Sequence, residues 1–273
     1  MLKARIAVFV SGGGTNLQAL IDAEKSGLLP SGHICLVVSN KAEAYALERA
    51  RQAGIPAVTL LRKDCGGQEG FEAALLALLE REKIDLIILA GFMSILSENF
   101  TRRFPERILN VHPSLIPSFC GKGFYGLRVH EAALAYGVKV TGATVHFVNE
   151  IPDGGRILLQ QAVSVLPGDT PEVLQKRVME QAEWKLLPQA AEMVSAEIVK
   201  GRAEQTWIFI RSTTWASSSR ATPMWAGASC WAALPTAARP SAPTSSWAAA
   251  RTAATGCSPC ATALCLPLSL IHI

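Results

Sequence analysis

Near its start the chain has a short apolar run that stops at three consecutive glycines. Residues 5–10 (RIAVFV) are apolar at almost every position, which is typical of a strand buried on both faces of a sheet. Glycines at positions 12–14 follow, and residues 17–25 then have the apolar spacing of a helix. A doubly buried strand that turns at once into a helix indicates a parallel sheet covered by helices on both faces.

The same alternation of strand and helix patterns continues to about residue 200. Further strands are expected at residues 33–39, 57–60, 86–90, 107–111, 144–148 and 156–165, and helices at 42–53, 70–83, 127–136 and 171–200. This pattern predicts an α/β fold with a doubly wound, mostly parallel sheet. The last two strands are joined by a short connection and should form an antiparallel addition near the C-terminal end.

Ligands bind beyond the carboxyl ends of the strands in sheets of this type. Here those ends carry the polar or glycine-rich segments 11–16, 91–96 and 112–117. Because the ends of parallel strands meet at one edge of the sheet, the sequence predicts a single cleft.

Composition divides the chain near residue 204. None of the 22 acidic residues and no lysine lies in residues 205–273, which hold five of the six tryptophans among runs of Ala, Ser, Thr and Pro. This segment has neither a strand pattern nor a helical one. We therefore expect residues 1–204 to form the folded domain. Our hypothesis is that residues 205–273 are an out-of-frame translation without a fold, and the alternative is a disordered extension.

Charge and cysteine usage limit the expected partners. The four arginines of residues 205–273 account for the net charge of +4, so residues 1–204 are neutral and give no argument for nucleic-acid binding. The scattered Cys35, Cys65 and Cys120 suggest no disulfide framework and fit a reducing compartment. No signal-peptide core and no run of 18 apolar residues is present. We expect a soluble cytoplasmic protein without a membrane partner.

The glycine-rich turn at residues 12–16 favours a phosphate, because it leads into a helix N-terminus with free backbone N–H groups. A dinucleotide site is not indicated: Leu17 stands where the G-x-G-x-x-G pattern needs glycine, and Asn40 stands where an acid would hold a ribose hydroxyl. No Gly-Lys-Ser/Thr follows, so a Walker A loop is also absent. A phosphomonoester is the favoured ligand, and a tight turn without a ligand is the alternative.

An amide, an imidazole and a carboxylate follow or end predicted strands. Asn110 and His112 are two residues apart, so a strand places both side chains on one face. Asp153 lies in the turn Pro152-Asp153-Gly154-Gly155. Each residue alone is an ordinary strand or turn residue. Together, at the edge that carries the glycine-rich turn, they predict catalysis of the transfer of an acyl carbon to an amine.

These motifs resemble a known family. Residues 11–17 (SGGGTNL), 91–93 (GFM), 110–117 (NVHPSLIP) and 146–148 (HFV), followed by Asp153-x-Gly155, are similar to phosphoribosylglycinamide formyltransferases over about residues 5–200. The resemblance implies a Rossmann-like formyltransferase fold. It also implies formylation of glycinamide ribonucleotide in purine synthesis, with 10-formyltetrahydrofolate as co-substrate and no metal.

The resemblance further implies site residues. Asn110, His112 and Asp153 match the catalytic trio, and Gly14, Thr15 and Asn16 match the loop that binds the ribonucleotide phosphate. Glu183 matches an acid that contacts the substrate, with one residue inserted near it. Gln68 stands where the family has an arginine, which leaves one folate contact unassigned, and Arg156 replaces a usual proline with little expected effect. The folate site is matched by Met93, Ser94, Ile95, Leu96, Asn110, Asn149, Glu150, Ile151 and Pro152.

In the expected mechanism, Asn110 donates a hydrogen bond to the developing oxyanion and protonated His112 stabilises it. Asp153 favours the charged imidazole and helps to move the proton. Cys120 is not expected to act as a nucleophile. His146 is expected to be a core residue or to support the site from behind.

Three alternatives stay open at this point. A formyltetrahydrofolate deformylase shares the trio but usually has an added N-terminal regulatory domain, whereas here the first strand is expected at residue 5. A methionyl-tRNA formyltransferase lacks the phosphate loop and adds an RNA-binding domain. A non-catalytic phosphate-ligand binding protein would not need the trio. We expect a monomer or a weak homodimer that binds glycinamide ribonucleotide and folate.

Overall fold

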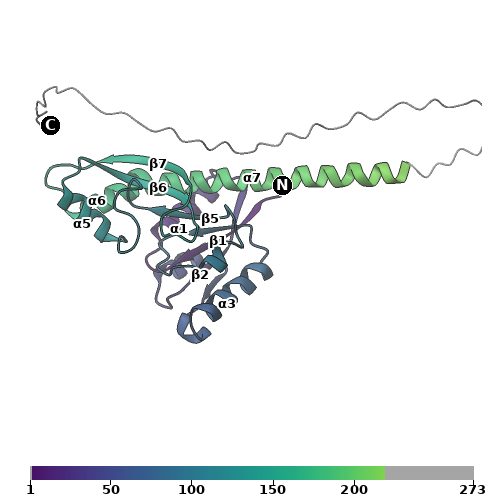
Figure 1. The fold of residues 1–273 in the computed structure, drawn as a ribbon, viewed down its shortest axis with the longest axis horizontal. Helices are drawn as coiled ribbons and strands as arrows, with labels where there is room; N and C mark the ends of the chain where they lie inside the picture. Colours follow the sequence, from purple (N-terminus) through teal and green to yellow (C-terminus); the bar gives the residue numbers. More distant parts are fainter. Residues whose placement is uncertain (1, 219–273) are drawn as a thin grey trace, which may run out of the picture. The chain divides into compact units, whose positions relative to one another are not determined.

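The computed structural model describes residues 2–218, with side chains as far as Glu204 (Figure 1). Its strands form one seven-stranded sheet in the order β3-β2-β1-β4-β5-β6-β7. The strands are β1 (Ala4–Val10), β2 (Gly32–Ser39), β3 (Ala57–Thr59), β4 (Leu86–Leu89), β5 (Ile108–His112), β6 (Val140–Phe147) and β7 (Ile157–Ser164). The first five are parallel, and β6 and β7 are antiparallel to their neighbours. The predicted fold class is confirmed.

Helices cover both faces of the sheet. They are α1 (Thr15–Lys25), α2 (Tyr45–Gln52), the 3-10 helix η1 (Arg62–Cys65), α3 (Gln68–Arg81), α4 (Glu98–Thr101), α5 (Leu127–Tyr136), α6 (Pro171–Val178), the π-helix η2 (Met179–Glu183) and α7 (Trp184–Ser218). One core joins the sheet to α1, α2, α6 and α7, and the other joins it to α3 and α4. Figure 1 shows α3 and α7 on opposite sides of the strands.

The side chains of strand β1 show why helices must cover both faces of the sheet. Ile6, Val8 and Val10 point into the core beneath α1 and α7, and Ala7 and Phe9 point into the core beneath α3. All five side chains are fully buried. Complete burial of one such aliphatic side chain contributes about 1.5–3 kcal/mol, so both layers of helices stabilise this strand. The apolar run of residues 5–10 therefore has the location that its composition predicts.

Strand β6 begins at Val140, four residues before the predicted start at residue 144. The additional residues pair with β7, with Thr141 opposite Val163 and Gly142 opposite Ala162. Glycine is disfavoured in strands, which hides this part of β6 in the sequence. The structure nevertheless requires glycine at position 142, because a Cβ there would lie 2.0 Å from the carbonyl oxygen of Gln161.

The helical region predicted at residues 171–200 is divided into α6, the π-helix η2 and α7. Helix α7 continues to Ser218, beyond the domain boundary predicted at residue 204. Residues 219–273, most of the predicted tail, lie outside the described residues, so the domain assignment stays a prediction. In the described part of the chain, no helix has the length and apolar character needed to cross a bilayer.

Candidate active site

The carboxyl ends of the parallel strands surround one cavity, as predicted, with a volume of about 610 Å³. We call it the cleft. It is bounded by α1, by the segments after β4 and β5, by the loop 121–126, by the turn after β6, and by α6 with the π-helix. Its lining residues are Asn16, Gly91–Ile95, Asn110–Pro113, Gly121–Gly126, Pro152, Asp153, Gln175, Met179 and Glu183.

The glycine-rich turn places the start of α1 at the cleft. Gly14 has a φ of 72°, and a Cβ there would lie 2.6 Å from the Cβ of Ala46, so only glycine fits. The backbone N–H of Ala46 donates to the Gly12 carbonyl at 3.0 Å, and Arg49 Nε donates to the Gly13 carbonyl at 2.8 Å. The turn is therefore fixed against α2, with the N–H groups of the first turn of α1 left for an anion.

The two predicted phosphate-loop side chains separate at this turn. Asn16 lines the cleft, whereas Thr15 lines a second cavity on the other side of α1. The Asn16 amide nitrogen donates to Glu183 Oε2 at 2.8 Å, which links the turn to the π-helix.

The register of strands β5 and β6 brings the side-chain amide of Asn110 close to His146 and Asp153. Asn110 lies directly opposite His146 in the antiparallel β5–β6 pair, and its Nδ2 is 3.2 Å from His146 Nε2. The same Nδ2 lies 3.5 Å from Oδ1 of Asp153. His112, on the same face of β5 as Asn110, places its Nδ1 3.5 Å from Oδ2 of Asp153. The structure thus brings the predicted trio together.

Asp153 is held in a constrained turn. Its φ is 55°, and its Oδ2 accepts a hydrogen bond from the Gly121 backbone N–H at 2.8 Å. Burial raises the pKa of the Asp153 carboxyl, but the His146 ring, the positive charge of His112 and the Gly121 N–H outweigh burial, so the pKa is lowered overall. Asp153 is therefore a carboxylate at neutral pH.

His112 is buried, with 4% of its surface exposed, and both ring nitrogens face acceptors. Nε2 lies 2.9 Å from the carbonyl oxygen of Phe119, and Nδ1 faces Asp153. A neutral imidazole has one N–H, whereas an imidazolium has two. The surroundings of His112 therefore suit the charged ring that the expected mechanism requires.

Glu183 stands at the end of the π-helix, and its side chain reaches the cleft. A π-turn holds one more residue than an α-turn, so η2 accommodates the residue that the resemblance places as an insertion. Burial raises the pKa of Glu183 to about 7, and the hydrogen bond from Asn16 offsets only part of this effect.

The residues that the resemblance assigns to the folate site divide into two groups. Met93, Ser94, Ile95, Asn110 and Pro152 line the cleft. The others do not: the Leu96 side chain is buried in the core beneath α3, Asn149 and Glu150 line a separate cavity of about 240 Å³, and Ile151 is exposed.

Gln68 and Arg156, the two residues that depart from the family pattern, both contact other side chains. Gln68 hydrogen-bonds to the Ile95 carbonyl at the cleft and to the Arg62 guanidinium, so the cation nearest this position comes from η1. Arg156 pairs with Glu106 at 2.8 Å and lies over the Phe147 ring at 4.6 Å, outside the cleft.

His146 is the clearest site residue that sequence reasoning placed only in the background. It is 1% exposed, and its Nε2 lies 3.6 Å from Asp153 Oδ1 as well as beside Asn110. The signal that identifies it is the cross-strand position opposite Asn110, which requires the register of β5 and β6. Gln175 and Met179 also line the cleft, and no sequence pattern singled them out.

Other reactive groups near the cleft have limited roles. Burial, and then the charge of Asp153, raises the pKa of the Cys120 thiol, which disfavours the thiolate. Burial, and then His112, lowers the pKa of His130 to about 4, so this ring is neutral at physiological pH. Among the residues whose side chains are described, no group of three or more His, Cys, Asp or Glu residues could hold a metal ion.

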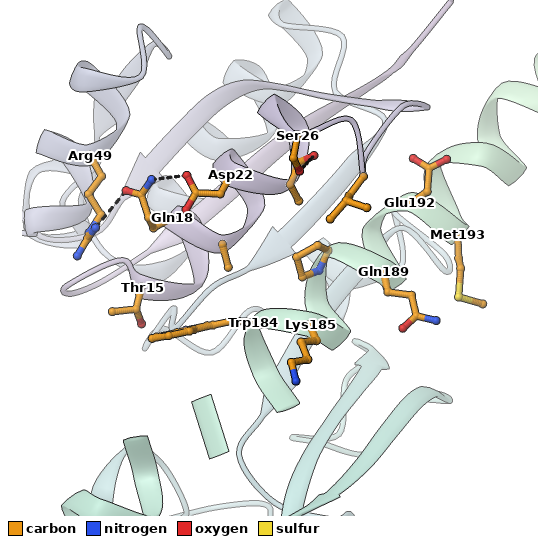
Figure 2. Close-up of a pocket in the computed structure, with 14 residues that line it drawn as sticks. Thr15, Gln18, Asp22, Ser26, Arg49, Trp184, Lys185, Gln189, Glu192 and Met193 are labelled. Atoms are coloured by element: carbon orange, nitrogen blue, oxygen red, sulfur yellow. Dashed lines mark hydrogen bonds between the residues drawn. The ribbon is translucent and has the colours of Figure 1, made fainter. Parts of the chain in front are cut away.

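The second cavity, which we call the groove, is larger, at about 790 Å³ (Figure 2). It lies between α1 and the first turns of α7, and Arg49 of α2 closes one end. Its lining residues are Thr15, Gln18, Ala19, Asp22, Ala23, Ser26, Leu28, Arg49, Trp184, Lys185, Pro188, Gln189, Glu192 and Met193.

Comparison with known proteins gives the same family at each level. The formyl transferase family model matches residues 4–191. The chain is 46% identical over 184 residues to the phosphoribosylglycinamide formyltransferase of Haemophilus influenzae. The matched region covers 67% of this chain and 84% of that protein. The chain is also 46% identical over 200 residues to the trifunctional purine biosynthetic protein adenosine-3 of Bos taurus, and it spans only 19% of that protein's length.

A solved structure agrees with this match. The glycinamide ribonucleotide transformylase 1 of Symbiobacterium toebii is 42% identical, with a TM-score of 0.67 over 71% of this chain and 89% of that one. The resemblance inferred from the motifs is thereby confirmed. The chain belongs to the formyl transferase family, and within it to the phosphoribosylglycinamide formyltransferases.

Proposed function

We propose that the protein transfers the formyl group of 10-formyltetrahydrofolate to the amine of glycinamide ribonucleotide, giving formylglycinamide ribonucleotide and tetrahydrofolate in de novo purine biosynthesis. The observation that carries this proposal is the convergence of Asn110, His112 and Asp153 in one cleft that also holds the start of α1. The proposal includes a cytoplasmic monomer or weak homodimer that needs no metal.

The cleft suits two ligands of different chemistry. Its rim has the exposed apolar side chains of Met93, Ile95 and Tyr125, which favour a flat ring system such as a pterin. On another side, Asn16 and the N-terminus of α1 favour the phosphate of the ribonucleotide. The catalytic trio lies in the same cavity, where the formyl carbon and the amine would meet.

Each residue of the trio has a distinct task. When bound, 10-formyltetrahydrofolate supplies the formyl carbon that the amine attacks. Asn110 donates a hydrogen bond to the oxygen on which negative charge develops, and charged His112 stabilises the same oxygen. Asp153 holds the imidazolium and accepts a proton for relay, while His146 keeps Asn110 and Asp153 in position. Preorganised donors of this kind account for a large part of catalysis in acyl transfer.

The test follows release of tetrahydrofolate from 10-formyltetrahydrofolate by the full chain, with and without glycinamide ribonucleotide. We expect release only when the ribonucleotide is present. Release without it would identify a deformylase instead. No release under either condition, from protein whose folding is verified by circular dichroism, would favour a protein that only binds phosphate ligands.

A further inference from the structure

A short backbone segment, residues 119–121, holds both members of the His112–Asp153 pair. The Phe119 carbonyl oxygen accepts a hydrogen bond from His112 Nε2 at 2.9 Å. Two residues later, the Gly121 N–H donates to Oδ2 of Asp153 at 2.8 Å, and the same oxygen lies 3.5 Å from His112 Nδ1. The position of the buried imidazole therefore depends on the backbone conformation of this segment.

Phe119 has a backbone conformation that is unfavourable for its residue type. Its φ is 51°, in the left-handed region that residues with bulky side chains rarely adopt. In the described part of the chain four non-glycine residues have a positive φ, and two of them, Phe119 and Asp153, carry the acceptors that face the two ring nitrogens of His112. Strain of this kind persists only where surrounding contacts impose it, and it is concentrated at functional sites.

The aromatic ring of Phe119 makes contacts that can impose this conformation. Its centroid lies 6.4 Å from that of Phe124, with the ring planes at 64°, and 6.0 Å from that of Tyr136, with the planes at 73°. Both pairs have the edge-to-face geometry that aromatic rings prefer. Phe124 belongs to the loop 121–126, and Tyr136 is the last residue of α5. The ring thus holds residue 119 between two elements, which a glycine with the same φ could not do.

The Phe119 carbonyl oxygen is left to the imidazole. The nearest other donor is the hydroxyl of Ser114, a fully buried residue, whose Oγ lies 3.5 Å from this oxygen but only 2.6 Å from the carbonyl oxygen of Ser118. A hydroxyl has one proton to donate, and the shorter contact to Ser118 uses it. His112 is therefore the main donor to the Phe119 carbonyl.

Resting on the proposed function, we propose that Phe119 is a positioning residue, whose ring holds its own backbone in the left-handed conformation so that its carbonyl oxygen fixes the His112 imidazolium. A carbonyl oxygen only accepts, so it requires a proton on Nε2, while the Asp153 carboxylate favours a proton on Nδ1. The two contacts together favour the doubly protonated ring that stabilises the oxyanion. Phe119 touches neither substrate in this role and acts through His112 alone.

The experiment compares Phe119→Ala with Phe119→Gly in the full chain. Both variants lose the ring, but alanine keeps the Cβ that disfavours a positive φ, whereas glycine adopts this φ readily. Phe119→Ala should lower kcat on the order of a hundredfold, with KM for both substrates within about threefold of the wild type. Phe119→Gly should recover roughly tenfold of this loss.

The opposite order would overturn the proposal. A ring that only fills space predicts that Phe119→Gly is at least as impaired as Phe119→Ala, because glycine makes the chain more flexible. Phe119→Tyr is the conservative variant, since it keeps the ring and its edge-to-face contacts. It should keep kcat within about threefold of the wild type, and a loss as large as that of Phe119→Ala would contradict the proposal.

Lys83 offers a matched control. It is exposed, has a φ of 50°, and lies between α3 and β4, at the end of the sheet opposite to the cleft. Lys83→Ala and Lys83→Gly make the same backbone comparison away from His112, so kcat of both should stay within about twofold of the wild type. If kcat of the Lys83 pair differed as much as that of the Phe119 pair, the effect would come from stability and not from His112.

Proton NMR tests the hydrogen bond without reference to turnover. In protein with isotope-labelled histidine, the buried Nε2 proton of His112 should give a downfield, slowly exchanging resonance. This resonance should disappear in Phe119→Ala and return in Phe119→Gly and Phe119→Tyr, and its persistence in Phe119→Ala would overturn the proposal. If the resonance responds as expected but the wild type and the Lys83 variants release no tetrahydrofolate with the ribonucleotide, the proposed function fails while the positioning of His112 by Phe119 stands.

Discussion

The cleft and the groove lie on either side of α1 and differ in what surrounds their polar groups. The cleft is lined by the almost completely buried side chains of His112 and Glu183, which face Asp153 and Asn16. Buried His146 lies behind the cleft and contacts Asn110 and Asp153. In the groove, the polar contacts include those of Gln18 with Asp22 and Arg49, and the hydrogen bond that the Ser31 backbone N–H donates to Glu192. The titratable side chains that line the larger cavity are therefore exposed or half-buried, whereas those of the cleft include fully buried groups.

The difference follows from the elements that build each cavity. The groove lies between helices, whose exposed faces have solvated side chains that need no fixed partner. The cleft lies at strand ends, where the backbone register holds side chains from β5 and β6 in fixed positions. Buried charges require such fixed partners, because an unpaired buried charge is costly. Volume alone does not indicate which cavity performs chemistry.

The largest expected difference between the cavities comes from removing one carboxylate in each. Asp153→Asn should lower turnover roughly a hundred- to a thousandfold, because His112 loses the charge that holds it as an imidazolium and Asn110 loses an anchor. Asp22→Asn, the same change in the groove, should leave turnover within twofold. Single-turnover rates of formyl transfer measure both. Similar rates for the two variants would show that the Asp153 carboxylate matters no more to the reaction than a surface carboxylate of the groove.

Asn110→Ala extends this prediction within the cleft. It removes the donor to the developing oxyanion and should also lower turnover roughly a hundred- to a thousandfold while the fold survives. Near-normal activity of this variant would refute the assignment of the trio. Circular dichroism of the variant checks that the sheet is intact.

Much of the fold could be predicted because the strands are short, apolar and separated by clear breaks. The run at residues 5–10 and the glycines after it are local signals, and so is the spacing of Asn110 and His112. Such signals depend on neighbouring residues, and the structure confirms the sheet that they predict.

What could not be predicted depends on long-range register. His146 is flanked by apolar residues and resembles a core residue until β6 is aligned with β5. Glu183 is the last residue of a π-turn, which hydrophobic spacing does not reveal. Likewise, Leu96 lies in the segment after β4 that lines the cleft, but its side chain points to the core.

The second expected effect concerns stability, with Glu183→Gln as the test. The folded-state pKa of Glu183 is about 7 against 4.5 for the free side chain, so the folded state binds its proton more tightly. Below pH 4.5 both states are protonated and the group costs nothing. As the pH rises from 4.5 to 7 the unfolded state ionises first, so the wild type loses stability, by about 3 kcal/mol above pH 7.

Glu183→Gln does not titrate and should escape this loss. Denaturant unfolding at several pH values should therefore show that the free energy of unfolding of the variant increases relative to that of the wild type between pH 4.5 and 7. Above pH 7 the difference between the two should be constant. Glu180→Gln, exposed on the same π-helix, should follow the wild type within about 0.5 kcal/mol. Parallel curves for wild type and Glu183→Gln would mean that Glu183 is not buried as the structure has it.

The smallest expected effect compares two methionines of similar exposure, Met93 in the cleft, which is 51% exposed, and Met193 in the groove, which is 40% exposed. Met93→Ala removes apolar surface from the rim where the folate rings would pack, which should cost about 1.4 kcal/mol and raise KM for 10-formyltetrahydrofolate about tenfold. Met193→Ala removes similar surface from the groove and should leave KM within twofold. Steady-state kinetics with the folate varied at saturating ribonucleotide measures both changes. A KM of Met93→Ala within twofold of the wild type would mean that Met93 does not contact the folate, whereas a larger effect of Met193→Ala would place the co-substrate in the groove.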